Sequence, residues 1–164
     1  MASRSIYTGP SNTDTESKPT SNFNDIYTTL TKEAAFPVLP SASPNPSQPS
    51  LSDAITSLHL HPVLEAILHI LNNDLPSAHF LCRHMQAPPA FEAMFLHGLL
   101  HRIEGDYRNA QAWYGDVSES EVFQHVWGGE GGLDGAKEFI NGVEKLRKEG
   151  KGDQKALELS LIHI

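Results

Sequence analysis

The chain has 164 residues, enough for one domain with an appendage, and 39% of them are hydrophobic, which is low for a chain that packs throughout. Its formal net charge is −8, and between Gln86 and Gly135 eight carboxylates stand against only Arg102 and Arg108. A phosphate backbone would be repelled by this segment, so we expect no nucleic-acid partner. No apolar run approaches the roughly 18 residues of a membrane span, and the single Cys82 allows no internal disulfide. We therefore expect a cytoplasmic protein without a membrane partner, although a nuclear location is also open.

Residues 1–50 are rich in Ser, Thr, Pro and Asn, and the prolines between Pro37 and Pro49 cannot sustain a helix. A segment of this composition buries too little apolar surface to offset the entropy lost on ordering. We therefore predict a disordered tail over residues 1–50. Phe23–Leu30 has enough apolar residues for a short docking motif, but a weakly ordered stretch of tail is the simpler interpretation.

Residues 51–149 show a helical pattern of apolar residues, interrupted by Asn, Asp, Gly and Pro, and we expect them to form one helical domain. Asp74 and Asp106 are suited to cap the start of a helix, and Asn73 and Gly105 to end the helix before. The expected helices cover about residues 62–71, 74–84, 90–103 and 106–116. The sequence therefore predicts two helical hairpins.

The two predicted hairpins repeat each other at an offset of 32 residues. Identical pairs at this offset are Leu64 with Leu96, Leu68 with Leu100, His69 with His101, Asp74 with Asp106 and Ala78 with Ala110. Small residues fall at matched places in the first helix (Ala66 and Gly98), where they would let two helix backbones approach closely. The repeat indicates that both segments fold in the same way.

The second hairpin resembles the tetratricopeptide repeat in the order of its small and aromatic residues, which are Gly98, Gly105, Tyr107, Ala110 and Tyr114. The resemblance covers residues 61–117, with a period of 32 in place of the family's 34 and Met94 where the family often has Trp. It implies an all-α fold of stacked antiparallel helical hairpins.

Beyond these two repeats, residues 118–143 suggest a degenerate third unit, and residues 150–164 suggest a C-terminal capping helix. Residues 77–128 are also similar to a group of uncharacterised fungal proteins, and residues 90–117 are the most alike. Related bacterial chains share the element His-Arg-x-Glu-Gly-Asp-x-x-Asn-Ala, which is His101–Ala110 here. This second resemblance implies no activity.

His97, His101 and Glu104 lie on one face of a predicted helix, because they are four and seven residues apart. Two imidazoles and a carboxylate could hold zinc or another divalent transition metal, with His125 as a further ligand. However, His69 occupies the position equivalent to His101 in the first hairpin, where a ring would pack between helices. A packed histidine without any cofactor is therefore the preferred interpretation, and a metal site is the alternative.

Polar and aromatic residues also gather around the turn of the second hairpin. The candidate binding residues are His97, His101, Arg102, Glu104, Asp106, Arg108, Asn109 and Trp113. Charged groups could orient a partner while Trp113 supplies contact area, although helix capping and intrahelical ion pairs would use the same residues. The leading hypothesis is a helical-repeat interaction module that binds a protein segment or a small ligand. The alternative is a small metal-dependent enzyme that uses His97, His101 and Glu104, and no catalytic residue can be assigned.

Overall fold

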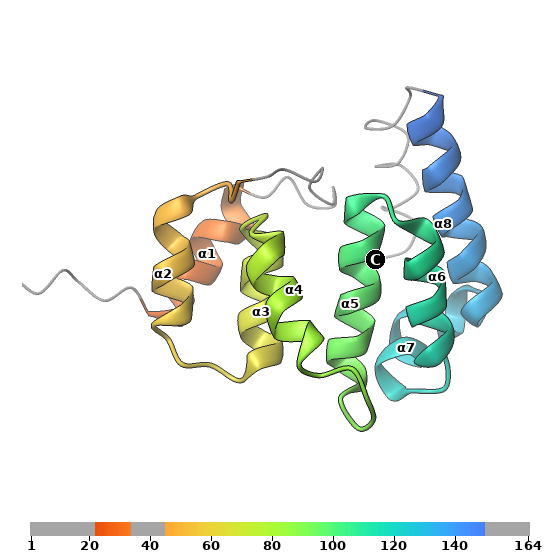
Figure 1. Cartoon of the computed structure of the whole chain (residues 1–164), viewed down its shortest axis with the longest axis horizontal. Coiled ribbons are helices and arrows are strands. Elements are labelled where there is room, and N and C mark those ends of the chain that lie inside the picture. The colour runs from red at the N-terminus through yellow and green to blue at the C-terminus, as the bar shows by residue number, and fades with distance from the viewer. Residues whose placement is uncertain (1–21, 34–44, 150–164) are drawn as a thin grey trace, which may run out of the picture.

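The structure is a computed structural model that describes residues 22–33 and 45–149, and these residues are all-helical, as predicted. The α-helices are α1 (Phe23–Glu33), α2 (Pro49–Thr56), α3 (Pro62–Leu71), α4 (Leu75–Arg83), α5 (Phe91–Glu104), α6 (Tyr107–Asp116), α7 (Glu121–Trp127) and α8 (Gly132–Lys148), with a short 3-10 turn at Gly128–Glu130. Successive helices from α2 to α6 run up and down across the molecule, and α8 lies along α6 (Figure 1). Within these two ranges, no helix combines the length and the apolar character needed to cross a membrane.

The two predicted hairpins are present as the pairs α3–α4 and α5–α6, and their turns have the same local geometry. Asn73 and Gly105 both adopt the left-handed conformation, with φ of 56° and 86°. Asp74 and Asp106 then cap the second helix of each pair, and each carboxylate accepts a hydrogen bond from the backbone N–H three residues later. The turns therefore match at the offset of 32 residues.

Close approach of α5 and α6 depends on Gly98. A Cβ atom at this position would lie 2.7 Å from Cδ1 of Tyr114 and 3.0 Å from Cβ of Trp113. Ala110 of α6 is fully buried in the same part of the core. The small residues in the second hairpin thus have the packing role that the sequence suggested.

A shared core holds the two hairpins together. It consists of Ala66, Ile70, Leu75, Ala78, Cys82, Leu96, Leu100 and Ile103, which come from α3, α4 and α5. Burial of this apolar surface is the main favourable term in packing α4 against α5. The relative placement of the hairpins is therefore fixed by a well-buried seam.

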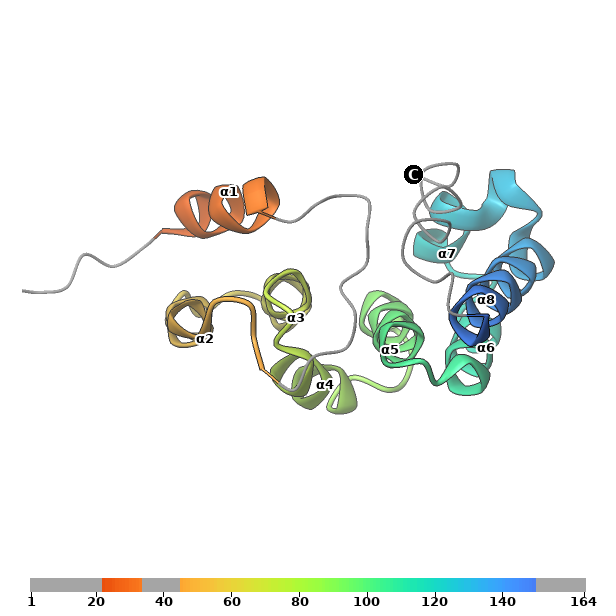
Figure 2. The same ribbon diagram turned by 90° about the horizontal axis from the view of Figure 1, so that it is seen from above.

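The N-terminal part of the chain differs from the prediction of a disordered tail over residues 1–50. Residues 23–33 form α1, which lies beside α2 and α3 (Figure 2). Ile26 and Leu30, one helical turn apart, are 1% and 3% exposed and pack with Ile55 of α2 and Leu68 of α3. The prediction failed here because the average composition of the tail concealed one short amphipathic helix.

The C-terminal elements follow the expected third unit only loosely. Ser120 caps α7 by accepting a hydrogen bond from the backbone N–H of Phe123. α8 is 17 residues long and packs against α6 and α7. The predicted capping helix over 150–164 lies outside the described residues, as do residues 1–21 and 34–44 of the predicted tail.

The packing of Gly98 can be tested with a matched pair of substitutions. Gly98→Ala should lower the free energy of unfolding by about 1–3 kcal/mol, because the new methyl group overlaps the buried ring of Tyr114. Gly115→Ala in α6 meets no atom within 4 Å, so it should raise that free energy by about 0.5–1 kcal/mol through helix propensity. Urea unfolding measures both values, and equal effects would contradict the described contact of α5 with α6.

The docking of α1 can be tested by proteolysis. Ile26→Asp buries a charge and should detach α1, so that trypsin cleaves after Lys32 at least about tenfold faster. Tyr27→Asp is the control, because Tyr27 is 47% exposed. Mass spectrometry of the fragments over time gives the two rates, and the same acceleration in both variants would mean that Ile26 does not anchor the helix.

Candidate metal centre between the two hairpins

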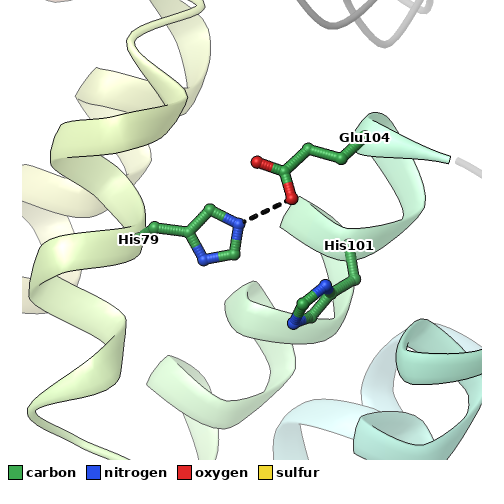
Figure 3. Close-up of side chains that lie close together, drawn as sticks. All are labelled: His79, His101 and Glu104. Carbon is green, nitrogen blue, oxygen red and sulfur yellow. Dashed lines mark hydrogen bonds and ion pairs between the residues drawn. The ribbon is translucent and has the colours of Figure 1, made fainter. Parts of the chain in front are cut away.

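Three potential metal ligands meet where α4 packs against α5. They are His79 of α4 and His101 and Glu104 of α5, which we call the metal triad (Figure 3). Nε2 of His79 lies 2.9 Å from Oε2 of Glu104, and one ligand atom from each of the three residues lies within 4.8 Å of the others. Both hairpins therefore contribute to the group.

The core explains why these side chains converge. Ala78, Leu100 and Ile103 are fully buried in the seam between α4 and α5. His79 directly follows Ala78, while His101 and Glu104 directly follow Leu100 and Ile103, so the triad residues emerge beside the seam. The side chain of His79 is 9% exposed and that of Glu104 is 35% exposed, so one side of the group reaches solvent.

His97 forms the inner wall of this group. Its ring stacks on that of His101 at a centroid distance of 5.0 Å and on Trp113 of α6 at 4.4 Å. His79 meets the same ring edge-on at 5.1 Å. With 4% exposure, His97 lies deeper than the triad and is enclosed by aromatic rings.

The cluster contains buried polar atoms without a hydrogen-bond partner among the described residues. These atoms are Nδ1 of His79, Nδ1 of His97 and Nδ1 of His101. Oδ2 of Asp106 lies 3.5 Å from Nδ1 of His101, which is close enough for electrostatic attraction but too long for a well-formed hydrogen bond. Because buried polar atoms are nearly always paired in folded proteins, three such atoms in one place indicate hydrogen-bonding capacity that the described residues do not use.

The equivalent histidine of the first hairpin, His69, faces two carboxylates of its own hairpin. His69 is 2% exposed, and its Nδ1 lies 3.1 Å from Oδ2 of Asp74. Its Nε2 faces Glu65 of the same helix at 3.8 Å. His69 is therefore buried, as the sequence suggested for a ring at this position. In the second hairpin His97 stands where Glu65 would be, so His101 has no carboxylate one turn earlier in its own helix.

The electrostatics keep the imidazoles of α5 neutral. Burial lowers the pKa of His97 to about 4, and electrostatic interactions with His79, His101 and Arg83 act in the same direction. The pKa of His101 is also lowered, first by burial and then by His79, although the carboxylates of Asp106 and Glu104 act in the opposite sense. Neutral imidazole is the form that binds a metal, so little proton displacement would be needed near neutral pH.

The structure changes the metal-ligand set suggested by the sequence. His101 and Glu104 come together as predicted, but the third potential ligand within reach is His79 and not His97. His125 is an exposed residue of α7 and does not belong to the group. The sequence argument considered His97, His101 and Glu104 of one helix together with His125, and it did not consider His79, which is 25 residues from Glu104 along the chain. Its position directly after the core residue Ala78 was the available signal.

Most of the other candidate binding residues contact their own chain. The guanidinium of Arg102 lies over the ring of Phe139, 5.0 Å from its centroid. Nδ2 of Asn109 donates a hydrogen bond to Oδ2 of Asp106 at 2.6 Å. Arg108 is exposed. Capping and packing therefore account for much of the polar character of this turn, and the histidines remain the part with unused chemistry.

Comparison of the chain with protein-family models, with curated proteins and with solved structures gave no match. The function must therefore be argued from the geometry of the site.

The buried position of His97 predicts a pH dependence of stability. The unfolded chain takes up a proton near the ordinary pKa of 6.5, and the folded chain only near pH 4. The contribution of His97 is thus complete above pH 6.5 and is lost as the pH falls toward 4, by on the order of 3 kcal/mol at a shift of this size. His97→Phe keeps a ring against Trp113 but cannot titrate, so its stability should fall less between pH 7 and about pH 4.

Urea unfolding at several pH values measures this difference. His125→Phe is the control, because it removes an exposed histidine outside the cluster. A His97→Phe profile parallel to that of the unmodified protein would show that His97 takes up its proton equally in both states.

Proposed function

We propose that this protein binds a divalent transition metal, with zinc as the first choice, through His79, His101 and Glu104. The observation that carries the proposal is the convergence of three ligand atoms within 4.8 Å from two separate hairpins. Two imidazoles and one carboxylate form a ligand set used for zinc and for other first-row metals. The cation would also offset the negative charge of Glu104, whose Oε2 lies 2.9 Å from Nε2 of His79.

The surroundings of the triad support a reactive ion over a purely structural one. Structural zinc sites are usually closed by four protein ligands, whereas three protein ligands leave one position for water or substrate. Glu104 lies at the solvent side of the group, which gives that position an entrance. Asp106, 3.5 Å from Nδ1 of His101, would orient this ligand as outer carboxylates commonly do. A metal held in this way can act as a Lewis acid or activate a bound water.

The helical-repeat interaction module expected from the sequence is the second candidate, with a tetratricopeptide-like stack as its scaffold. One observation favours it: Phe80 of α4 is 65% exposed, and its ring lies 4.7 Å from that of His84. Large exposed aromatic side chains are common at protein interfaces. Phe80 and His84 lie on the first hairpin, whereas the sequence predicted a binding surface on the second. The two rings do not indicate which kind of ligand would bind.

The metal proposal predicts stoichiometric binding that depends on each triad residue. Calorimetric titration of the untagged, chelator-treated full chain with Zn²⁺ should give one ion per chain. His79→Gln, His101→Gln and Glu104→Gln should each weaken binding by at least about tenfold, as expected for the loss of one ligand. Zinc at about 100 times its dissociation constant should add about 2.7 kcal/mol to the free energy of unfolding of the unmodified protein.

His125→Gln is the matched control, because it makes the same change at an exposed histidine of α7. Circular dichroism of each variant without metal verifies that it is folded. Co²⁺ is tested separately as a second probe. The proposal would be refuted if the chain bound neither Zn²⁺ nor Co²⁺ at 100 µM. Triad variants that bind Zn²⁺ as tightly as the unmodified protein would refute the assignment of the ligands.

A further inference from the structure

The metal triad has a positively charged residue at its edge that the triad itself does not use. Arg83 belongs to α4 and follows His79 by four residues, so the two side chains project from the same face of that helix. Arg83 is exposed, and within the described part of the chain it forms no ion pair or hydrogen bond. Its guanidinium donors are thus available to a ligand.

His97 offers a second unused group beside the triad. Its Nδ1 is buried without a hydrogen-bond partner among the described residues, and its ring is held between His101 and Trp113. A neutral imidazole ring carries one N–H donor. A neutral donor fixed in this way can hold an oxygen atom without the cost of burying a further charge.

The local charge favours an anion although the chain as a whole carries a net charge of −8. A divalent metal brings two positive charges to a triad with one carboxylate, and Arg83 adds a third. Asp106 lies on the other side of His101 and offsets only part of this charge. Electrostatic attraction in a partly buried site is screened less than on the open surface.

We propose that the open position of the metal binds a small oxyanion, a carboxylate or a phosphate group, which Arg83 and His97 hold from the protein side. This inference rests on the proposed metal binding and extends it by naming the class of ligand. One oxygen of the group coordinates the metal. A second oxygen accepts hydrogen bonds from the guanidinium of Arg83, which suits carboxylate and phosphate geometry.

The test uses the full chain loaded with Co²⁺, whose visible absorption responds to a change in its ligands. Sodium acetate and inorganic phosphate are added separately at constant ionic strength, with sodium chloride as the reference. We expect a saturable spectral change with at least one of the two anions. Arg83→Gln should weaken binding of that anion by about tenfold or more, because a charge-assisted contact is lost, and it should not weaken Co²⁺ binding, because Arg83 is not one of the triad ligands.

Two further variants complete the design. His97→Phe keeps the stacked ring, but it should also weaken binding of the anion, because the ring nitrogen Nδ1 is lost. Arg108→Gln removes an exposed arginine of α6 and should change neither affinity. A response to acetate alone identifies a carboxylate ligand, and a response to phosphate alone identifies a phosphate ligand.

The possible outcomes distinguish the proposed oxyanion site from the proposed metal binding on which it rests. Failure of the chain to bind Co²⁺ would remove both the proposed metal function and the oxyanion site. Normal Co²⁺ binding with a spectrum that neither anion changes would overturn the oxyanion site alone. An anion affinity that is the same in Arg83→Gln and in the unmodified protein would also overturn it, because the protein side of the site would then be absent.

Discussion

The packing of α4 against α5 is the constraint on which the candidate site depends, because neither hairpin contains the metal triad by itself. The apolar seam that includes Ala78, Leu100 and Ile103 sets the distance between the two helices. The contact of 2.9 Å between His79 and Glu104 follows from that packing. The ring column of His101, His97 and Trp113 then links the site to α6. The hydrophobic contacts on the inner side of the metal triad therefore hold its polar side chains in position.

Local chemistry predicted the helical part of the fold well. Asp74 and Asp106 cap their helices, and Asn73 and Gly105 have left-handed backbones, as their residue types suggested. These signals act over three or four residues, so they can be recognised in one sequence. α1 was less predictable, because its stability comes from burying Ile26 and Leu30 against residues that are far along the chain. Averaged composition is insensitive to two such side chains.

The candidate site was predictable only in part, for the same physical reason. His101 and Glu104 belong to one helix, where periodicity indicates a shared face. That face extends from the core to the surface, and periodicity does not show at which depth a residue lies. His97 is only 4% exposed, so it lies on the inner side of the group and not at its surface. His79 joins through a tertiary contact over 25 residues, which depends on the angle and separation of the two hairpins.

The paired histidine and aspartate of each hairpin have a consequence for how such a site can arise. His69 with Asp74, and His101 with Asp106, place an imidazole beside the carboxylate that caps the following helix. In the first hairpin the imidazole of His69 lies 3.1 Å from the capping carboxylate of Asp74. An internal repeat copies this arrangement along with the rest of the unit, and so it supplies each copy with an oriented imidazole before any ligand is bound. A site between two copies then requires changes only where the copies face each other, as His79 of the first hairpin and Glu104 of the second do here.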